Sequence, residues 1–318
     1  QRQMCIRDRK KVIKPIEKKS VLQELNSETF VRKTNFANHE IYVLNHLNSP
    51  NTLLEIGRLR ELTFRMAGGG TGKELDLDDF DTRSEAYYNQ LIVWDPDALE
   101  IIGGYRFIKG EKVIVSKKHK DLATNSLFHF SKQFETTYLP QTIELGRSFV
   151  QPGYQPSSGN RKGIFSLDNL WDGLGALVVD NEEIKYFFGK VTMYLDYPKQ
   201  ARDLILTFIG HYFPDNDGLV TAKSPLDLYN DTSFFIKEIS TLNYEEAYKL
   251  LTQHVRKLNT SVPPLISAYM SLSSTMKSFG TALNKKFGDV EETGILISID
   301  DIFEQKKERH INSYLKEK

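Results

Sequence analysis

Three arginines and three carboxylates lie within or beside apolar stretches of this 318-residue chain. They are Arg60, Arg106, Arg147, Asp78, Asp81 and Glu144. Charges in apolar segments are costly unless they are paired or used. A structural ion-pair network would explain any single pair, whereas convergence of all six groups would indicate a site. We therefore treat the six residues as candidate catalytic and substrate-binding groups.

The segment ELGR carries two of these charges at an informative spacing. Residues three apart on a regular strand, such as Glu144 and Arg147, point to opposite faces of the sheet. Gly146 lies between them and could mark a β-bulge, which would shift the alternation. We predict that a bulge here turns both side chains toward one cleft.

The elements that must position these charges can be read from hydrophobic periodicity. A helix is predicted over 52–66, which places Arg60 and Phe64 on one face and ends at the glycines 68–70. Strands predicted over 88–94 and 101–108 form a hairpin around a Pro-Asp turn, and Arg106 lies near the end of the second. A third strand over 142–150 carries Glu144 and Arg147.

The rest of the chain completes a mixed α/β pattern. Further expected elements are a strand over 39–45, an ambiguous segment over 126–134, a loop over 151–163, a helix over 165–179, a strand over 186–195, and a helix over 199–212. The region from about 224 onward is expected to be mostly helical, with helices over 244–258 and 263–276 and a short strand over 293–299. We predict a core domain over 10–223 and a C-terminal, mostly helical portion over 224–318 that completes or caps it.

Composition narrows the class of protein. Hydrophobic residues make up 40% and charged residues 26% of the chain, as in ordinary globular proteins, and the formal net charge is zero. A net charge of zero gives no support for a nucleic-acid-binding protein, because such proteins attract phosphates with excess positive charge. The single cysteine, Cys5, excludes an internal disulfide and a Cys-based metal site. The absence of a spanning apolar run and of a signal peptide predicts a cytoplasmic protein.

The N-terminal residues need separate treatment. Residues 1–9 resemble translated sequencing-adapter sequence, so they are excluded from fold reasoning. Residues 10–20 are rich in lysine, which could attract anionic lipid. A solvated, frayed terminus is the simpler expectation for such a segment.

Several motifs of other enzyme classes are incomplete. AGGGTGKE has Ala67 and Glu74 where a phosphate-binding P-loop needs Gly and Ser or Thr, so a flexible glycine hinge is expected. There is no HExxH pair and no GxSxG elbow, which argues against zincins and α/β-hydrolases. No histidine is followed at the fifth position by aspartate, the pair used by glycerolipid O-acyltransferases. No metal site is predicted.

The ordered series LRELTF, DLDDFD, GGYRF and ELGRSFV resembles the motif set of the hemolysin-like N-acyltransferases, which make ornithine and glycine lipids. The series is more distantly similar to acyl-homoserine-lactone synthases. NLWDGLGALV, VPPLISAYMSLSSTM and FGDVEETGILISI extend the resemblance over most of 40–215 and 262–303. The PPLL-type end, and the lack of Trp in 65–77, favour the lipid-forming branch.

The resemblance implies a GNAT fold and a phosphopantetheine thioester donor carried by acyl carrier protein, commonly bearing a 3-hydroxy fatty acid. The expected reaction is aminolysis, with a small amino acid such as glycine or ornithine as acceptor. Glu144 would accept the amine proton, and Arg147 or Arg106 would bind the acceptor carboxylate. Asp78 and Asp81 would hold the acceptor ammonium or pair with the arginines. Backbone N–H groups of the third strand would stabilise the oxyanion.

The donor needs contacts of its own. Gly159, Arg161, Lys162 and Gly163 precede a helix and could bind its phosphate, although an ordinary exposed loop is nearly as good an interpretation. The usual GNAT pyrophosphate pattern is not intact, which favours a carrier-protein donor over coenzyme A. No tightly bound cofactor is expected. Lys117, Lys118 and Lys120 could form part of the carrier-protein dock. Phe64, Phe107 and Phe149 are candidates to line an acyl tunnel.

Two alternatives remain from the sequence. One is a coenzyme-A-dependent GNAT acetyltransferase acting on a peptide or small amine. The other is a non-catalytic lipid-binding or membrane-lytic protein, which should carry a strongly amphipathic or spanning segment, and none is found. A lipid product would also make peripheral contact with the inner face of the membrane plausible.

Overall fold

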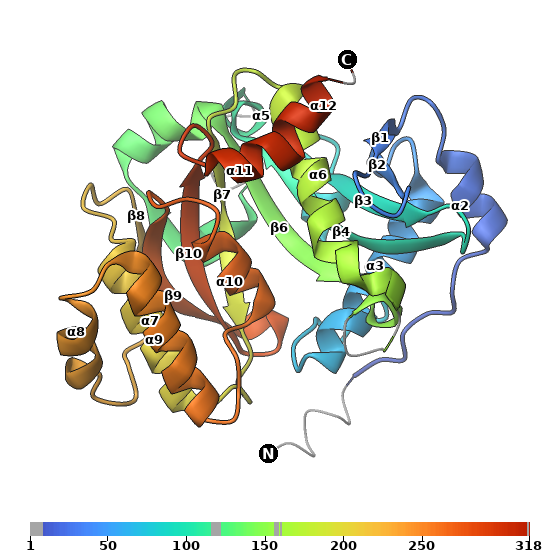
Figure 1. Cartoon of the computed structure of the whole chain (residues 1–318). Coiled ribbons are helices and arrows are strands. Elements are labelled where there is room, and N and C mark those ends of the chain that lie inside the picture. The colour runs from blue at the N-terminus through green and yellow to red at the C-terminus, as the bar shows by residue number, and fades with distance from the viewer. Residues whose placement is uncertain (1–8, 116–121, 156–158, 160, 317) are drawn as a thin grey trace.

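The computed structural model describes residues 9–115, 122–155, 159, 161–316 and 318 (Figure 1). Its centre is an eight-stranded sheet in the order β1-β2-β3-β4-β6-β7-β10-β9, and β5 and β8 form a separate small ribbon. The strands are β1 Phe30–Lys33, β2 Glu40–Leu44, β3 Asn89–Asp95, β4 Glu100–Lys109, β5 Phe128–Phe130, β6 Thr142–Val150, β7 Tyr186–Met193, β8 Val220–Ala222, β9 Lys277–Asn284 and β10 Val290–Ser298.

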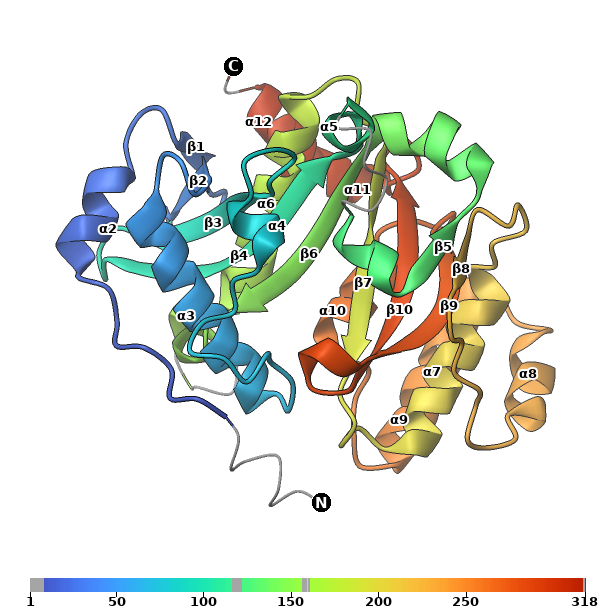
Figure 2. The same cartoon turned by 180° about the vertical axis from the view of Figure 1, so that it is seen from behind.

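Helices cover both faces of this sheet. They are α2 Lys18–Glu24, α3 Pro50–Met66, α4 Asp79–Thr82, α5 Gly110–Val115, α6 Ser166–Val179, α7 Lys199–Tyr212, α8 Ser233–Ile239, α9 Tyr244–Lys257, α10 Pro264–Met270, α11 Glu304–Lys307 and α12 Ser313–Leu315. Helix α6 crosses one face over β3 and β4, and α3 lies on the opposite face (Figures 1 and 2). Helix α3 has Pro50 at its first turn and buries Leu53, Ile56 and Phe64.

One pair of neighbouring strands separates along its length. Every pairing in the large sheet is antiparallel except that of β6 with β7, which is parallel. That parallel pairing covers only Thr142–Glu144 against Tyr186–Phe188. Beyond it, β6 remains paired with β4 and β7 with β10, so the two strands diverge (Figure 1). The gap between them opens in the middle of the sheet.

The structure confirms the predicted mixed α/β class and most elements of the first two-thirds of the chain. Helices α3, α6 and α7, the β3–β4 hairpin, and strands β6 and β7 all fall within a few residues of their predicted bounds. The C-terminal portion contains more helix than strand. It also supplies β10, which pairs with β7 along its whole length, and β9 at the edge. These two strands complete the sheet.

Two expectations about the C-terminal portion were wrong in detail. The helix predicted to reach Met276 ends at Met270, because the next residues turn to meet the segment before α11. Leu272 accepts a hydrogen bond from the Phe303 amide at 3.0 Å, and Ser273 forms a bridge with Ile302. Strand β9 was not predicted, and β10 is longer than the strand expected over 293–299.

The lysine-rich N-terminal segment is not frayed from Arg9 onward. The amides of Lys10 and Ile13 donate to the carbonyls of Gly72 and Glu74 at 2.9 and 3.3 Å. The glycine loop it contacts is also held in place, which differs from the expected hinge. The buried carboxylate of Glu61 accepts from Thr71 and Gly72 amides at 3.0 and 2.8 Å.

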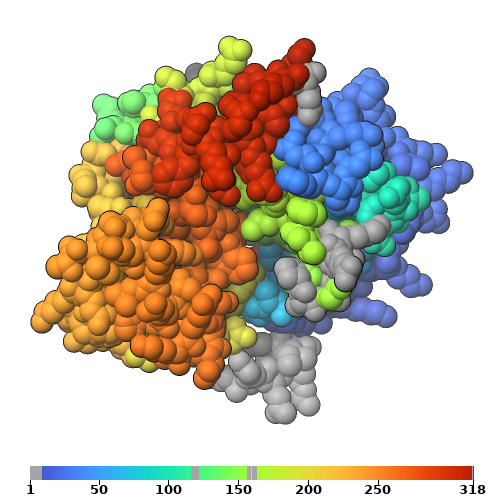
Figure 3. Space-filling view, in the orientation of Figure 1, coloured from blue at the N-terminus to red at the C-terminus, as the bar shows by residue number. Residues whose placement is uncertain are grey.

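The C-terminal helices close over α6. The π-helical turn Glu308–Asn312 packs against α6. Buried Asp172 on α6 binds His310 Nδ1 at 2.7 Å and Asn35 Nδ2 at 2.7 Å. In the space-filling view these last helices (red) lie against the surface of the N-terminal strands (blue), as those hydrogen bonds require (Figure 3). The two ends of the chain are thereby joined on one face of the sheet.

Candidate active site

Asp76 is the carboxylate on which two arginines meet. Its Oδ2 accepts from Arg60 Nε at 3.1 Å and from Arg147 Nε at 2.8 Å. Asp76 and Arg60 are fully buried. Burial alone would raise the pKa of Asp76, but Arg147 and Arg60 hold that pKa below its usual value. Asp76 therefore stays ionised and links α3 to β6.

A second carboxylate, Asp81, joins Arg60 to Arg106. Arg60 Nη1 lies 3.3 Å from Asp81 Oδ1, and Arg106 Nη1 lies 3.2 Å from Asp81 Oδ2. Arg106 Nη1 also donates to Asp78 Oδ1 at 2.8 Å. Burial would lower the pKa of Arg106, but Asp81 and Asp78 raise it further above its usual value. Asp76, Asp78, Asp81, Arg60, Arg106 and Arg147 thus form a network of zero net charge, which we call the Arg–Asp network.

Local structure fixes the acidic segment. Asp78 is the N-cap of α4 and accepts from the Phe80 amide at 3.0 Å, while Asp81 accepts from the Asp78 amide at 3.1 Å. This reciprocal capping box is the reason that two aspartates three residues apart sit at the start of a short helix. It also turns their remaining oxygens toward Arg106.

A bulge in β6 brings Glu144 and Arg147 to the same cleft. The pairing of β6 with β4 shifts register between Gly104 and Arg106, so Arg147 and Ser148 together oppose one residue of β4. Arg147 has a φ of 50°, a left-handed conformation that is costly for a side-chain-bearing residue. The bulge therefore lies one residue beyond Gly146, which pairs regularly with Arg106.

Glu144 is buried in a short chain of hydrogen bonds. Its Oε2 accepts from the Tyr88 hydroxyl, and its Oε1 accepts from the Thr124 amide at 2.9 Å. The Tyr88 oxygen in turn accepts from the Ala123 amide at 2.8 Å. Burial raises the pKa of Glu144, and the hydrogen bonds from Tyr88 and Thr124 only partly offset this rise. A carboxylate of raised pKa is suited to accept a proton near neutral pH.

Sequence analysis missed a second ion pair on the other side of the strand gap. Lys190 on β7 binds Glu292 on β10, and Glu292 also accepts from Asn284 Nδ2 at 2.8 Å. Burial, followed by repulsion from Arg147 and Arg106, lowers the pKa of Lys190, whereas Glu292 opposes that shift. Neither residue belongs to the motifs that predicted the other charges.

Most of these groups line one small cleft of about 60 Å³. Its walls come from α3, the β3–β4 hairpin, β6, β7, α10 and β10, and the lining residues are Phe64, Tyr88, Tyr105, Arg106, Ala123, Glu144, Leu145, Gly146, Arg147, Ser148, Lys190, Thr192, Leu265, Tyr269, Phe287 and Glu292. Buried Arg106 Nε has no hydrogen-bond partner among the described residues. A donor left unpaired in a cleft is available to a ligand. Asp76 and Asp81, by contrast, lie behind the cleft wall.

The predicted aromatic residues divide between the cleft and the core. Phe64 lines the cleft and packs edge-on against Phe287, with ring centroids 4.9 Å apart. Phe107 and Phe149 are buried in apolar core clusters instead and are not among the cleft residues. Plain core packing therefore replaces the proposed tunnel role for these two.

The predicted phosphate-binding segment is only partly described. Gly163 begins the approach to α6, and a Cβ added there would lie 2.2 Å from the Tyr154 carbonyl oxygen, so only glycine fits. Gly159 is exposed with a φ of 71°. The side chains of Arg161 and Lys162 lie outside the described residues, as do Lys117, Lys118 and Lys120 of the predicted carrier-protein dock. Those roles stay predictions.

Comparisons with known proteins show the family of the chain. Residues 59–161 match the family described as "Acetyltransferase (GNAT) domain". A glycine N(alpha)-acyltransferase of Phocaeicola vulgatus is 50% identical over 307 residues, covering 96% of this chain and 94% of that protein. A glycine N(alpha)-acyltransferase of Bacteroides thetaiotaomicron is 52% identical over 309 residues, covering 96% of this chain and 90% of that protein.

Two solved structures were also found, both of BjaI, described as a CoA-dependent acyl-homoserine lactone synthase, one with SAM and isopentyl-CoA and one with MTA. They are 11% and 12% identical, cover 88% of this chain and 89% of theirs, and have a TM-score of 0.38. Within the described part of the chain, no helix is both long and apolar enough to span a bilayer, and no three His, Cys, Asp or Glu side chains are grouped for a metal ion.

Proposed function

The chain belongs to the family of the glycine N(alpha)-acyltransferases and is an N-acyltransferase with a GNAT domain. From this we propose that it moves a fatty acyl group from a phosphopantetheine thioester to the amine of glycine. The observation that carries the proposal is the position of Glu144. This buried carboxylate lines a small cleft beside the gap between β6 and β7, opposite cationic groups.

The proposed reaction is direct aminolysis of the thioester. Glycine first loses one proton of its ammonium group, and the free amine then attacks the thioester carbonyl carbon. A C–N bond forms, and the nitrogen gives up a second proton, which Glu144 accepts directly or through water. The tetrahedral intermediate collapses with cleavage of the C–S bond, and the sulfur leaves with the bonding electrons. The amide and a thiol are the products, and one proton is released to solvent.

Backbone amides of β6 are suited to bind the oxyanion. From Leu145 onward, β6 has no pairing with β7, so its β7-facing backbone groups border the gap. Amide donors that are fixed before the reaction stabilise a developing oxyanion without reorganisation. A thioester held in the gap would place its carbonyl between Glu144 on one strand and the start of the separated part of β7 on the other.

The cationic side chains suit an acceptor with a carboxylate. Arg147 is partly exposed in the cleft, and its guanidinium lies 4.1 Å from the Phe287 ring centre. Arg106 offers its unpaired Nε in the same cleft. Asp78 and Asp81 are engaged by the arginines, which favours their pairing role over direct binding of the ammonium. Glycine is proposed over ornithine as acceptor because the two relatives of about 50% identity are described as glycine N(alpha)-acyltransferases.

Acyl carrier protein is the proposed carrier of the donor thioester, with coenzyme A as the alternative. The proposal rests on the incomplete GNAT pyrophosphate pattern in the 159–163 segment. The enzyme would act in the cytoplasm, and an acylated amino acid would enter the membrane. We therefore also propose peripheral membrane contact through exposed apolar side chains on α8 and in the segment before it, which are Leu228, Tyr229, Phe234 and Ile236.

Product analysis tests this function. The purified protein is incubated with a long-chain 3-hydroxyacyl carrier protein, the same acyl-coenzyme A, or acetyl-coenzyme A, each with glycine or with ornithine, and the products are identified by mass spectrometry. We expect N-acylglycine from the carrier-protein donor. Product only from acetyl-coenzyme A, or only with ornithine, would overturn the proposed donor or acceptor respectively.

The Glu144→Gln variant provides the matched control for the chemistry. It keeps the shape of the side chain and its hydrogen bonds to Thr124, but it cannot accept the amine proton. We expect turnover to fall by about 100-fold or more with an unchanged thermal unfolding midpoint. A variant that folds normally and retains most of its turnover would remove Glu144 from the proposed role.

A further inference from the structure

We propose that Lys190 is a catalytic acid that protonates the departing sulfur, and that Glu292 positions its ammonium group. The proposal rests on the thioester aminolysis proposed above and adds the residue that completes it. Without a proton donor, the thiolate would leave as an anion inside a buried cleft, which is costly.

The topology places Lys190 across the gap from Glu144. The last parallel pair joins Glu144 to Phe188, and Lys190 follows two residues later on β7, so it lies on the same face of the sheet as these residues. Both Glu144 and Lys190 line the cleft, one from each diverging strand. A thioester between the strands would have a proton acceptor on its β6 side and a proton donor on its β7 side.

The ammonium group of Lys190 is bound by a buried carboxylate that is itself held by hydrogen bonds. Its side chain is 12% exposed, and Glu292, at 2% exposure, binds its Nζ. Glu292 is fixed from two sides, by Asn284 Nδ2 at 2.8 Å and by Thr192 Oγ1 at 3.5 Å. A buried lysine that only stabilised the fold would not need to open onto the cleft that holds Glu144.

The charged groups that face Lys190 adjust its acidity. Burial lowers the pKa of Lys190 most, and repulsion by Arg147 on β6 and Arg106 on β4 lowers it further. Glu292 acts in the opposite direction, and the net lowering makes the ammonium a better proton donor. The tyrosines of the cleft are poorer donors. Burial raises the pKa of Tyr105 and raises that of Tyr269 well above its usual value, and Tyr88 already donates to Glu144.

With Lys190 as the acid, every proton in the reaction is accounted for. As the C–S bond breaks, the electron pair stays on sulfur, and the Lys190 ammonium gives it one proton and becomes a neutral amine. Glu144 has meanwhile taken one proton from the attacking nitrogen. Transfer of that proton through water to Lys190 restores both groups. The surplus proton of the glycine ammonium passes to solvent, and no other reactant is needed.

The leaving group supplies a specific test. Turnover of Lys190→Met is compared with that of the unaltered enzyme for two donors with the same acyl chain, an alkyl thioester of pantetheine and an aryl thioester of thiophenol. Thiophenol is the stronger acid and leaves readily without protonation. We expect the variant to lose about 100-fold or more with the alkyl donor but less than about 10-fold with the aryl donor. An equal loss with both donors would refute the proposal.

Lys190→Arg is the matched control for charge. Arginine keeps the positive partner of Glu292 but does not release a proton at neutral pH. We expect it to be as impaired with the alkyl donor as Lys190→Met. Nearly full activity in Lys190→Arg would show that only the charge matters, and it would overturn the catalytic-acid role.

Two further variants cover misfolding and add a pH readout. If Lys190→Met unfolds because Glu292 is left unpaired, the donor comparison is made in the double variant Lys190→Met with Glu292→Gln. Glu292→Gln alone removes the group that raises the pKa of Lys190, so its alkaline loss of turnover should begin at lower pH. An unshifted alkaline limb would contradict the positioning role of Glu292. Failure of the unaltered enzyme to acylate any amine would instead defeat the proposed function itself.

Discussion

At the scale of single residues, the Arg–Asp network explains how buried charge is tolerated beside the cleft. Three guanidinium groups and three carboxylates neutralise one another, and Asp76 accepts from two of the arginines. A buried ion pair contributes little net stability compared with an apolar pair, yet removal of one partner leaves an uncompensated charge. Asp76 and Asp81, each buried and shared by two arginines, are therefore the members whose loss should be most damaging.

Replacement of Asp76 with Asn should destabilise the protein by about 3–5 kcal/mol, because Arg60 and Arg147 each lose one counter-charge and the buried network keeps an uncompensated positive charge. Urea unfolding measures this change. Asp79→Asn is the control, since Asp79 is an exposed acidic residue of the same segment, and its free energy of unfolding should change by less than about 0.5 kcal/mol. Equal stability of the two variants would contradict the central position of Asp76.

The same variant predicts a pH effect of definite sign. The pKa of Asp76 is lower in the folded state than in the unfolded chain, so its ionisation stabilises the fold above the unfolded pKa of about 3.9. This contribution is lost as pH falls through the lowered folded pKa. The stability of Asp76→Asn should therefore fall less steeply below about pH 4 than that of the unaltered protein.

Sequence reasoning found six of the buried or partly buried charges and missed Asp76, Lys190 and Glu292. Arg60, Arg106, Glu144 and Arg147 stood out because each lies in an apolar element, and Asp78 and Asp81 stood out in the acidic loop. Asp76 begins the same DLDDFD segment but was not singled out, because only the folded chain brings Arg60 and Arg147 to it. Lys190 and Glu292 also escaped notice, because charges in a strand usually face solvent.

At the scale of elements, the bulge in β6 and the divergence of β7 create the site. Alternation along β6 predicted a strand with the correct bounds, and the glycine in ELGR pointed to an irregularity nearby. Strand β9 was missed for a related reason. Gly280 in it has a φ of 80°, and the pairing with β10 shifts register between Thr293 and Ile295, which breaks the period-two pattern.

The contact between α6 and the C-terminal turn depends on one glycine. A Cβ at Gly175 would lie 2.0 Å from the His310 carbonyl oxygen, so Gly175→Ala should displace the turn and cost about 1–3 kcal/mol by overpacking. Gly210→Ala in α7 is the matched control, because nothing lies within 4 Å of its added Cβ. That control should stabilise the protein by about 0.5–1 kcal/mol.

Urea denaturation of both variants measures the difference, and limited proteolysis reports whether the C-terminal turn is released. Cleavage near residues 304–315 should accelerate in Gly175→Ala alone. Two variants of equal stability and equal protease resistance would show that the close packing of the turn on α6 is unimportant.

At the scale of the whole molecule, the cleft requires residues from both the N-terminal and the C-terminal third of the chain. Its lining runs from Phe64 on α3 to Glu292 on β10, and β10 reaches the site only because it pairs with β7 along eight residues. The C-terminal portion therefore supplies part of the catalytic machinery proposed above. Local patterns predicted helices there, but the completion of the sheet depends on pairing between residues about 100 positions apart, which no local pattern encodes.

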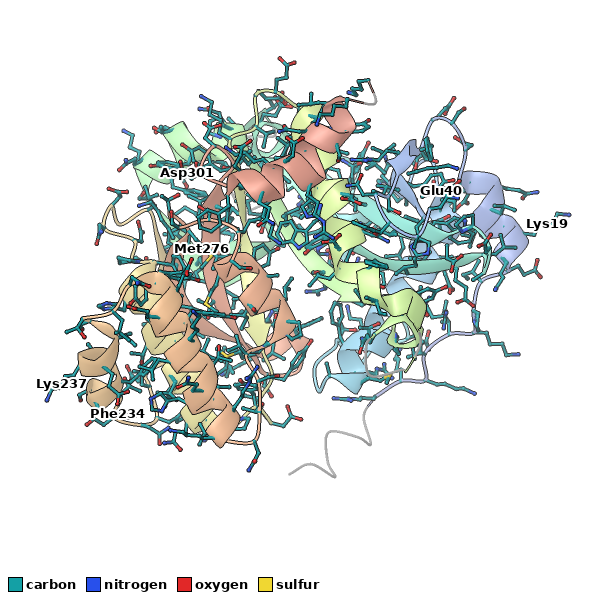
Figure 4. The ribbon with its side chains drawn as sticks, viewed as in Figure 1. Lys19, Glu40, Phe234, Lys237, Met276 and Asp301 are labelled. Atoms are coloured by element: carbon teal, nitrogen blue, oxygen red, sulfur yellow. The ribbon has the colours of Figure 1, made fainter. Side chains whose placement is uncertain are left out.

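Exposed apolar side chains at the α8 end of the molecule lie beside lysines, and this arrangement predicts how the protein meets a membrane. Phe234 and Lys237 project from α8 at one end, whereas α2, which carries Lys19, lies at the other (Figure 4). Phe234 and Ile236 are 45% and 42% exposed, with exposed Tyr229 nearby, where the Lys199 ammonium lies 4.1 Å from its ring centre. Apolar side chains flanked by lysines suit the surface of an anionic bilayer.

Co-sedimentation with phosphatidylglycerol vesicles tests this contact. The double variant Phe234→Ser with Ile236→Ser should bind about tenfold more weakly, because two partly exposed apolar side chains no longer enter the interface. Leu22→Ser on α2 is the matched control, since Leu22 has the same 45% exposure as Phe234 but lies at the opposite end, and it should leave binding unchanged. If the control weakens binding as much as the α8 variant, or if neither does, α8 is not the membrane-facing element.

Turnover without vesicles should be equal in all three proteins, because α8 contributes no residue to the cleft. A variant that changes vesicle binding but not turnover then shows that the α8 side chains act in membrane contact and not in the reaction.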